Sequence, residues 1–185
     1  VADGIIQPVR EPTEWCLPIV VAPKKDPTKI RLCIDFRPLN KYSKRYLYRT
    51  PSTLESVQRV KASEAKIFST FDAVKGFHQI ALHEESIPLT TFMTPYGRYQ
   101  YLRAPFGVNS ISEYFNMTFD EKMEGIENRE RIVDDSLLYE KNVEEHESQV
   151  RKFLMRCREH NIRLSAEKFE YAKDCVEFAG FLVHK

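Results

Sequence analysis

The stretch IVDDSLLY, residues 132–139, sets two adjacent aspartates between apolar residues. Apolar residues on both sides of a short acidic pair predict a strand, a tight turn and a second strand. Two carboxylates in such surroundings are costly unless a cation compensates their charge. At the tip of a hairpin, Asp134 and Asp135 reach a common divalent ion, and their hard oxygen ligands select Mg²⁺ or Mn²⁺. The alternative is a plain Asp-Asp turn on a surface hairpin.

A third aspartate ends another predicted strand. Residues 67–72, IFSTFD, read as a strand that ends at Asp72, beside a short turn at Lys75-Gly76. By itself, Asp72 is either a metal ligand or a cap of the loop. Together, three aspartates at two strand ends suit two metal ions roughly 3.5–4 Å apart, which activate a 3′-hydroxyl and support a leaving pyrophosphate. The pattern therefore favours phosphoryl transfer, in which positioning and charge stabilisation account for most of the catalysis.

The rest of the chain mixes strand and helix patterns. Alternating apolar runs bounded by turn residues predict strands, and apolar residues spaced by three or four predict helices. Ser52 is a natural cap for the first helix, with Leu54, Val57 and Val60 on its buried face. The predicted elements are strands at 18–23, 30–36, 67–72 and 79–82, a hairpin of 90–95 and 98–103, a loop over 37–51, helices over 53–62, 110–124 and about 143–161, and a final strand or hairpin at 175–183. This mixed order predicts the α+β class.

Charge is distributed unevenly along the chain, although the total is only +1. Residues 1–50 hold ten Lys and Arg against five Asp and Glu, whereas residues 111–185 hold twelve against seventeen. A basic N-terminal part and an acidic C-terminal part suit a protein that binds a polyanion at one end and cations at the other. Ordinary solvated faces give the same balance, so charge alone leaves both interpretations open.

Composition excludes some classes of protein. Of 185 residues, 42% are apolar and 30% are charged, and no apolar run approaches the roughly 18–20 residues of a spanning helix, which excludes a membrane protein. The chain begins with Val1 and shows no signal-like segment, so we expect a fragment or a processed product. The four cysteines, Cys16, Cys33, Cys157 and Cys175, form no C-x-x-C pair, which predicts reduced, buried thiols rather than a zinc site or disulfides.

Several stretches resemble motifs of reverse transcriptases in their order and spacing. They are RLCIDFRPLNK (31–41), FDAVKGFHQI (71–80), RAPFGVNSISEYF (103–115) and VDDSLLY (133–139). TPYGRYQYLRAPFG (94–107) is especially similar to gypsy-class LTR retrotransposons, and EFAGFLV (177–183) resembles their primer-contacting hairpin. The resemblance covers nearly the whole chain, from Gly4 to His184.

The resemblance implies a fold and an activity. The implied fold is the α+β polymerase right hand, with fingers at 1–66 and 81–104, palm at 67–80 and 105–185, and no thumb. The implied activity is that of an RNA-directed DNA polymerase, which copies retrotransposon RNA into DNA from dNTPs on a primed RNA or DNA template. Thumb and RNase H segments of the same polyprotein are expected beyond Lys185. No membrane is expected among the partners. The expected location is the cytoplasm, within retroelement particles, or the nucleus.

The resemblance also implies roles for individual positions. Asp72, Asp134 and Asp135 match the catalytic aspartates that hold Mg²⁺, or Mn²⁺. Lys168 matches a lysine near the pyrophosphate, where it can act as general acid, although an exposed loop lysine is common. The remaining matches are Lys24, Lys25 and Arg31 for the incoming triphosphate, Phe77, Phe106 and Gly107 for the nucleotide pocket, and Arg37, Asn40 and Gly180 for template and primer. Plainer alternatives remain for them: a solvated turn for the lysines, a core aromatic for Phe77, and a salt bridge or turn for Arg37 and Asn40.

One position departs from the family pattern. Reverse transcriptases commonly have an aromatic residue two places before the paired aspartates, and this chain has Ile132 there. Glu130 and Arg131 precede it where an apolar strand is expected. Ile132 and the charged run 127–131 favour a second hypothesis, a catalytically decayed element that binds nucleic acid without turnover, whereas the intact aspartates oppose it. A third hypothesis is an unrelated two-metal nuclease or phosphatase, which needs neither a basic hairpin nor a pocket at Phe77.

Overall fold

A four-stranded antiparallel sheet carries the acidic hairpin. Its order is β7 (Arg129–Ile132), β8 (Asp135–Glu140), β4 (Ile67–Asp72) and β9 (Glu170–Lys173). All three neighbouring pairs are antiparallel. The predicted strand at 67–72 and the predicted strand–turn–strand around the aspartate pair are both confirmed.

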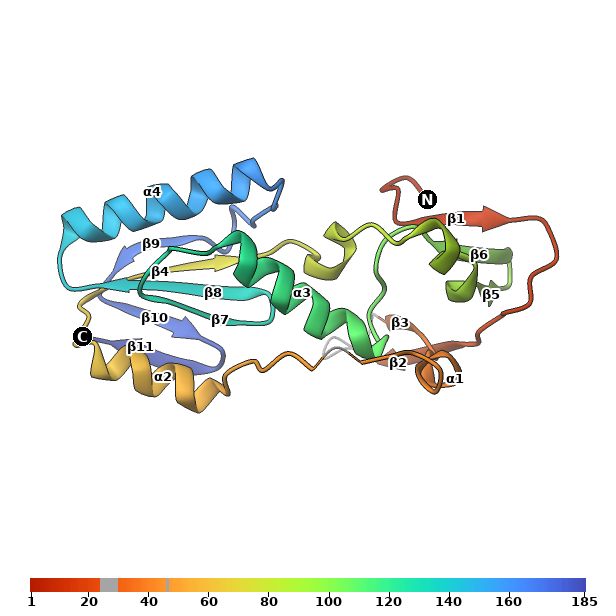
Figure 1. The fold of residues 1–185 in the computed structure, drawn as a ribbon, viewed down its shortest axis with the longest axis horizontal. Helices are drawn as coiled ribbons and strands as arrows, with labels where there is room; N and C mark the ends of the chain where they lie inside the picture. Colours follow the sequence, from red (N-terminus) through yellow and green to blue (C-terminus); the bar gives the residue numbers. More distant parts are fainter. Residues whose placement is uncertain (24–29, 46) are drawn as a thin grey trace. The chain divides into compact units, whose positions relative to one another are not determined.

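The computed structural model describes residues 1–23, 30–45 and 47–185 (Figure 1). The chain divides into two compact units, which are Val1–Leu47 with Phe77–Phe115, and Tyr48–Gly76 with Asn116–Lys185. We call them unit 1 and unit 2. The four-stranded sheet belongs to unit 2, and the border between the units falls within helix α3 (Asn109–Lys122).

Helices and a hairpin cover both faces of the unit 2 sheet. Helix α4 (Val143–Glu159) packs on β8 and β4 on one face. Helix α2 (Thr53–Ala62) and the hairpin of β10 (Cys175–Phe178) and β11 (Phe181–His184) lie on the other (Figure 1). Residues 68, 70 and 72 of β4 share this second face, because side chains alternate along a strand. The core face therefore ends at Asp72.

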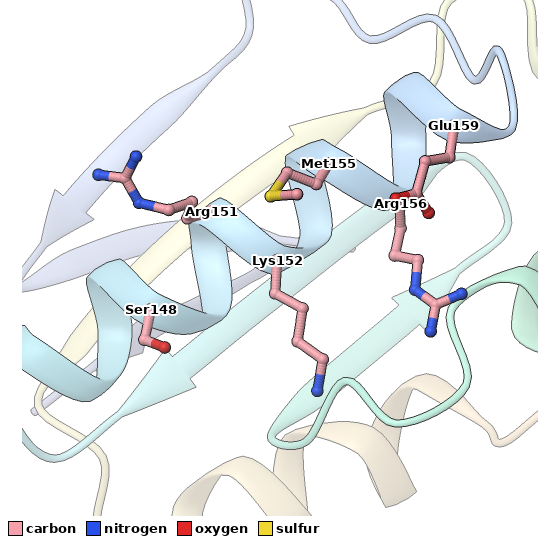
Figure 2. A pocket seen from close by; sticks show the side chains of 6 residues that line it. All are labelled: Ser148, Arg151, Lys152, Met155, Arg156 and Glu159. Atoms are coloured by element: carbon pink, nitrogen blue, oxygen red, sulfur yellow. The ribbon is translucent and has the colours of Figure 1, made fainter.

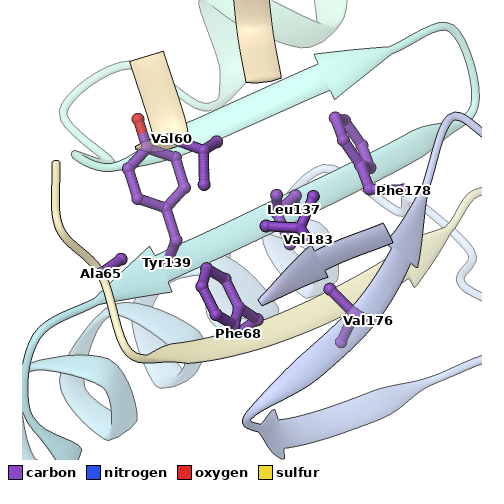
Figure 3. Close-up of a cluster of buried hydrophobic side chains, with 8 residues drawn as sticks. All are labelled: Val60, Ala65, Phe68, Leu137, Tyr139, Val176, Phe178 and Val183. Carbon is purple, nitrogen blue, oxygen red and sulfur yellow. The ribbon is translucent and has the colours of Figure 1, made fainter. Parts of the chain in front are cut away.

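A cluster of buried side chains forms the core on that second face. Figure 3 shows it, and its members are Val60, Ala65, Phe68, Leu137, Tyr139, Val176, Phe178 and Val183. Burying a large apolar side chain stabilises a fold by about 1.5–3 kcal/mol. Ile132, in the place where the family commonly has an aromatic residue, packs against this cluster. The cluster thus anchors the strands on both sides of the aspartates.

Helix α2 spans the predicted residues 53–62 and begins at a capping box. Ser52 Oγ accepts a hydrogen bond from Glu55 N, and the Glu55 carboxylate accepts one from Ser52 N. The prediction that Leu54 lies on the buried face is wrong, because Leu54 is 58% exposed. Ser56 and Val60, four residues apart, face the sheet, and Leu54 is about 200° around the helix from Ser56.

Unit 1 is built on a small sheet and a separate hairpin. The sheet has the order β1 (Ile6–Val9), β6 (Gly97–Tyr101) and β5 (Phe92–Thr94), and the hairpin pairs β2 (Ile19–Pro23) with β3 (Ile30–Ile34). Short helices complete it: α1 (Arg37–Asn40), and the 3-10 helices η1 (Gly76–Gln79), η2 (Glu84–Ser86) and η3 (Pro88–Thr90). Its core consists of Leu17, Ile34, Phe36, Leu39 and Phe92.

Some local predictions are wrong. The predicted strand at 79–82 is absent from the described residues, since η1 occupies 76–79 and Ala81 makes only a single bridge with Arg103. The backbone N–H of Ile80 donates to the Phe77 carbonyl and closes this turn, as expected of a chain that bends after Gly76. The predicted loop 37–51 contains α1, which has a proline in its first turn. Strands β1 and β9 were not predicted.

The four cysteines are free in the structure and only partly buried. Cys157 is buried and Cys33 is half-buried, whereas Cys16 and Cys175 are exposed, so the expectation of burial is wrong for these two. Within the described part of the chain, no helix has the length and apolar character needed to cross a membrane.

The predicted subdomains divide the chain differently from the compact units. The predicted fingers include residues 53–62, whereas this segment, helix α2, lies in unit 2. Residues 105–115 lie in unit 1 but within the predicted palm. The boundaries of fingers and palm therefore stay a prediction.

Candidate active site

Two of the predicted catalytic aspartates lie opposite each other in neighbouring strands. Asp72 is the last residue of β4, Asp135 is the first residue of β8, and the two are partners in the antiparallel register. Directly opposite residues point to the same face, with Cβ atoms about 4.5–5.5 Å apart. Like charges in such a pair are destabilising unless something compensates them. The sheet thus brings two carboxylates together at one end.

The third aspartate lies in the turn between β7 and β8. Ile132 pairs with Asp135, so Val133 and Asp134 form a two-residue loop. Val133 has a φ of 54°, which a β-branched residue rarely adopts, and such strain concentrates at functional sites. The Asp134 carbonyl accepts a hydrogen bond of 2.9 Å from Ala73 N, which ties the turn to the residue after Asp72. The predicted trio is therefore brought together.

The surroundings of the turn disfavour ionisation of its carboxyls. Burial raises the pKa of Asp134, and the charges of Asp72 and Asp135 act in the same direction. Burial also raises the pKa of Asp135, again with the charge of Asp72. Among the described residues, the buried oxygen Oδ1 of Asp134 has no hydrogen-bond partner. A cation at this place would satisfy both the unpaired oxygen and the excess of negative charge.

Lys168 supplies one positive charge to this group. Its Nζ lies 2.7 Å from Asp72 Oδ2, and the hydrogen bond with Asp72 raises the pKa of the lysine. The loop that carries Lys168 is held nearby, since Ser165 N donates to the Asp72 carbonyl at 2.8 Å. The Lys168 side chain is mostly exposed, whereas that of Asp72 is mostly buried. One ammonium against three carboxylates leaves the group negative.

The residues present fit a hard divalent cation. Within residues 1–23, 30–45 and 47–185, no set of three or more His, Cys, Asp or Glu side chains is already arranged around a metal position. Mg²⁺ commonly takes only one or two carboxylates, with water and substrate phosphates completing its shell. The unpaired Asp134 oxygen and the facing carboxylates of Asp72 and Asp135 supply oxygen ligands of that kind.

Unit 1 holds the predicted nucleotide-pocket residues. Phe77 is buried and its ring centroid lies 4.9 Å from that of Phe106 and 5.4 Å from that of Phe115. Phe106 is half-exposed. Gly107 has a φ of 97°, which favours glycine, and a Cβ there would meet the Phe36 ring at 3.4 Å. Phe77 thus packs as a core aromatic, and its role toward a sugar stays a prediction.

The predicted template residues make contacts within unit 1. Asn40 Nδ2 donates to the Gly107 carbonyl at 2.8 Å, and Asn109 N donates to Asn40 Oδ1 at 3.0 Å, so one side chain spans the loop 107–109. Arg37 Nη2 lies 2.6 Å from Asp35 Oδ2, and this pairing lowers the pKa of Asp35 to about 2. Asn40 thus has the alternative role in a turn, and Arg37 forms the alternative salt bridge. Contact of either residue with a template stays a prediction.

Other predicted site residues lie at hairpins. Lys24 and Lys25 lie outside the described residues. Arg31 pairs with Ala22 in the backbone register of β2 and β3, and its side chain lies outside the described part. Gly180, with a φ of 83°, and Ala179, with a φ of 50°, form the turn between β10 and β11, as a type I′ hairpin requires.

Sequence reasoning noted two charged residues before the turn but did not foresee that they are buried and paired. Glu130 and Arg131 of β7 are both buried, and each is paired. Arg59 of α2 contacts Glu130 at 2.6 Å, and Asp120 of α3 contacts Arg131 at 3.1 Å. Charged residues at positions where an apolar strand is expected were the available signal, because such residues need partners when they are buried.

A separate hollow of about 200 Å³ lies on α4 (Figure 2). Its lining residues are Ser148, Arg151, Lys152, Met155, Arg156 and Glu159. None of them is a predicted site residue. Arg151 pairs with Glu147 at 3.0 Å along the helix, and Lys152 donates to the Gly125 carbonyl.

Comparison with known proteins establishes the family. The family described as "Reverse transcriptase (RNA-dependent DNA polymerase)" matches residues 22–183. The Pol polyprotein of transposon gypsy of Drosophila melanogaster is 34% identical over 196 residues, which cover 99% of this chain and 18% of that protein. The enzymatic polyprotein of Cauliflower mosaic virus (strain D/H) is 33% identical over 153 residues, which cover 82% of this chain and 22% of that protein. This chain belongs to the reverse transcriptase family, and the predicted resemblance to gypsy-class elements is confirmed.

Solved structures agree on the fold. The prototype foamy virus protease–reverse transcriptase matches with a TM-score of 0.86 at 24% identity, covering 99% of this chain and 24% of that chain. A foamy viral protease–reverse transcriptase in complex with an RNA/DNA hybrid matches with a TM-score of 0.85 at 22% identity, covering 98% of this chain and 24% of that chain. The predicted α+β polymerase fold is confirmed. The chain spans about a fifth of the length of the two polyproteins named above.

Proposed function

We propose that this chain carries the nucleotidyl-transfer centre of an RNA-directed DNA polymerase within a longer polyprotein. The observation that carries the proposal is the register of β4 and β8, which sets Asp72 opposite Asp135 with Asp134 in the adjoining turn. Membership of the reverse transcriptase family supports the same conclusion. The relatives that include gypsy suggest that the natural template is retrotransposon RNA.

The three aspartates would hold Mg²⁺, and Mn²⁺ suits the same oxygen ligands. Asp72 and Asp134 are proposed as the principal ligands, with a smaller part for Asp135. The bound cations would stabilise negative charge on the attacking and leaving oxygens. In the reaction, the primer 3′-hydroxyl releases its proton to solvent and its oxygen forms a bond to the α-phosphate of a dNTP. The bond between that phosphate and pyrophosphate breaks. Lys168, whose Nζ lies 2.7 Å from Asp72 Oδ2, is proposed to donate a proton to the departing pyrophosphate.

The remaining predicted residues are proposed to bind nucleotide and nucleic acid. Lys24, Lys25 and Arg31 would bind the triphosphate, since cationic side chains suit a polyanion. The half-exposed ring of Phe106, with Phe77 beneath it and Gly107 beside it, offers an apolar surface to a sugar. Arg37 and Asn40 are proposed for the template and Gly180 for the primer.

We propose the partners of the whole protein by analogy with its relatives. A foamy viral relative has been solved with an RNA/DNA hybrid, and a primed RNA or DNA template is therefore proposed as the partner of this chain. Because the chain spans a small part of its polyprotein relatives, thumb and RNase H segments are proposed to act with it. The location proposed is the cytoplasm, within retroelement particles, or the nucleus.

Incorporation of dNTPs on an RNA template with a DNA primer tests the proposal. The protein is this chain extended through its natural downstream sequence, assayed with and without Mg²⁺. Asp134→Asn is expected to lower incorporation by at least about 100-fold, because it removes a charged metal ligand while keeping the shape. Asp174→Asn is the matched control, since Asp174 is an exposed aspartate paired only at the surface with Lys185. Incorporation that survives in Asp134→Asn would refute the assignment of the metal site.

A second candidate function is a decayed element that binds nucleic acid without turnover. Ile132 at the usual aromatic position is the observation in its favour. A folded wild-type protein that binds primed template but incorporates nothing would support this candidate over the first.

A further inference from the structure

Arg131 is a buried arginine directly behind the proposed catalytic turn. Its side chain is only 3% exposed, and it lies in β7, three residues before Asp134. Its Nη1 donates to Val133 O at 2.9 Å and to Asn116 Oδ1 at 2.7 Å. The first of these bonds reaches the backbone of the turn itself. A guanidinium has five N–H donors, so Arg131 can pair with the carboxylate of Asp120 and still donate to the turn carbonyl.

The bond to Val133 fixes one side of Asp134. The Val133 carbonyl belongs to the peptide plane before Asp134, and Arg131 holds that plane. The Asp134 carbonyl belongs to the plane after it, and Ala73 N holds that plane. Because both neighbouring planes are held, the direction in which the Asp134 side chain leaves the backbone is fixed. This matters for Val133, whose φ of 54° is unfavourable for a β-branched residue and would relax without restraint.

Contacts from helix α3 hold Arg131 itself in place. Its Nη2 donates to the Asn116 carbonyl and to Asp120 Oδ2, both at 3.1 Å. Its guanidinium carbon lies 5.0 Å from the centroid of the Phe119 ring. Asp120 in turn accepts a hydrogen bond of 2.8 Å from the hydroxyl of Tyr48. The guanidinium is thus clamped between α3 and the turn and has little freedom to move.

We propose that Arg131 is a positioning residue of the active site, which sets the orientation of Asp134 through the Val133 carbonyl. The inference rests on the proposed function, because it assigns Arg131 a task in metal-dependent nucleotidyl transfer. The proposal also explains why this strand position has a charged residue, although the family pattern predicts an apolar residue there. The rival interpretation is that Arg131 only stabilises unit 2.

A neighbouring arginine provides a matched control. Arg129 lies on the same strand, pairs with the same Asp120 at 2.9 Å and lies over the same Phe119 ring at 5.8 Å. Its bonds to Asp120 do not involve the turn. Arg131→Met and Arg129→Met therefore both remove a guanidinium from the same aspartate, and only the first removes the bond to Val133.

Two readouts on the extended protein separate positioning from stability. In single-turnover incorporation, Arg131→Met should lower the maximal rate about 10–100-fold, the loss typical of residues behind metal ligands. The half-saturating dNTP concentration should change less than about threefold, and the half-saturating Mg²⁺ concentration should rise. Arg129→Met should keep the maximal rate within about threefold. The second readout needs no catalysis: hydrogen exchange at the Ala73 amide, which bonds the turn, should speed up at least about fivefold in Arg131→Met only.

If Arg131→Met does not fold, the variant Arg131→Lys tests the positioning role instead. Lysine keeps the charge near Asp120 but lacks the planar fork that reaches Asn116 and Val133 together, so the rate loss and the faster Ala73 exchange should both persist. Wild-type rate and exchange in Arg131→Lys, or equal effects in Arg131→Met and Arg129→Met, would overturn the proposal. A fast Ala73 amide in Arg131→Met alone, in a protein whose wild type incorporates nothing, would support the positioning role and refute the proposed function.

Discussion

Arg59→Met is expected to destabilise unit 2 strongly, because it leaves the buried carboxylate of Glu130 without a cationic partner. Glu130 is only 5% exposed, and Arg59 donates to both of its oxygens, from Nε at 2.7 Å and from Nη2 at 2.6 Å. Tyr139 lies against the same carboxylate: burial raises the pKa of Tyr139 to about 12, and the charge of Glu130 contributes. After the substitution, Glu130 keeps its burial but loses its cation.

The loss of stability depends on how well water can replace the Arg59 guanidinium. Removing one partner of a buried ion pair commonly costs about 3–5 kcal/mol. The Arg59 side chain is 50% exposed, so water can partly replace it, and we expect a loss of about 2–3 kcal/mol. For unit 2 unfolding by itself, with 99 residues, that corresponds to roughly 8–24 °C in Tm. The double variant Arg59→Met/Glu130→Leu removes both charges and should return to within about 1 kcal/mol of the parent.

Urea unfolding measures these differences unit by unit. The chain has a single tryptophan, Trp15, which packs against the core of unit 1, so its fluorescence follows that unit. Far-UV circular dichroism follows helices α2 and α4 of unit 2 as well. We expect Arg59→Met to shift the dichroism transition and to leave the Trp15 transition in place. A single variant as stable as the parent, or a double variant as unstable as the single one, would refute the reasoning.

Two further predictions concern buried titratable groups in unit 2. His146, bonded to Ser69 Oγ at 2.6 Å, has its pKa lowered by burial below the ordinary 6.5, so its contribution to stability is present above about pH 6.5 and is lost as the pH falls through the folded value. Between pH 7.5 and 5.5 the urea midpoint should fall more in the parent than in His146→Leu, and equal falls would count against it. Burial raises the pKa of the Cys157 thiol to about 12, whereas Cys16 and Cys175 are exposed. A thiol reagent near pH 8 should therefore modify Cys16 and Cys175 in the folded protein and Cys157 only after unfolding, as mass spectrometry of the peptides would show.

The elements that carry the aspartates could be predicted because their signals are local. Alternation fixes the strand that ends at Asp72, and the acidic pair between apolar runs fixes the hairpin. The register that sets Asp72 opposite Asp135 then follows from burying one face of each strand. Helix α2 was predicted with its bounds because Ser52 is a natural N-cap before an apolar helical period, and the structure shows Ser52 in a capping box with Glu55.

The remaining errors arise where distant contacts decide. Leu54 fits a helical period, but the face that α2 buries is chosen by the sheet it packs on. The segment 79–82 alternates like a strand, yet within the described residues it makes only the single bridge of Ala81 with Arg103. The partners of the buried charges lie far along the chain, since Arg59 and Glu130 are 71 positions apart. No local pattern contains such a pairing.

The charged pair Glu130-Arg131 need not mark decay, because strand geometry gives each residue its own partner. Successive residues of a strand point to opposite faces, so Glu130 and Arg131 leave β7 on different sides of the sheet. Glu130 shares the face of Leu137 and meets Arg59 of α2, and Arg131 shares the face of Ser136 and meets Asp120 of α3. The two adjacent charged residues thus pair β7 with α2 on one face and with α3 on the other, directly before the turn that carries Asp134. An apolar pair would bury the same strand but would leave the Val133 carbonyl without its guanidinium donor. Ile132, which also favoured a decayed element, packs against the core cluster of its own unit.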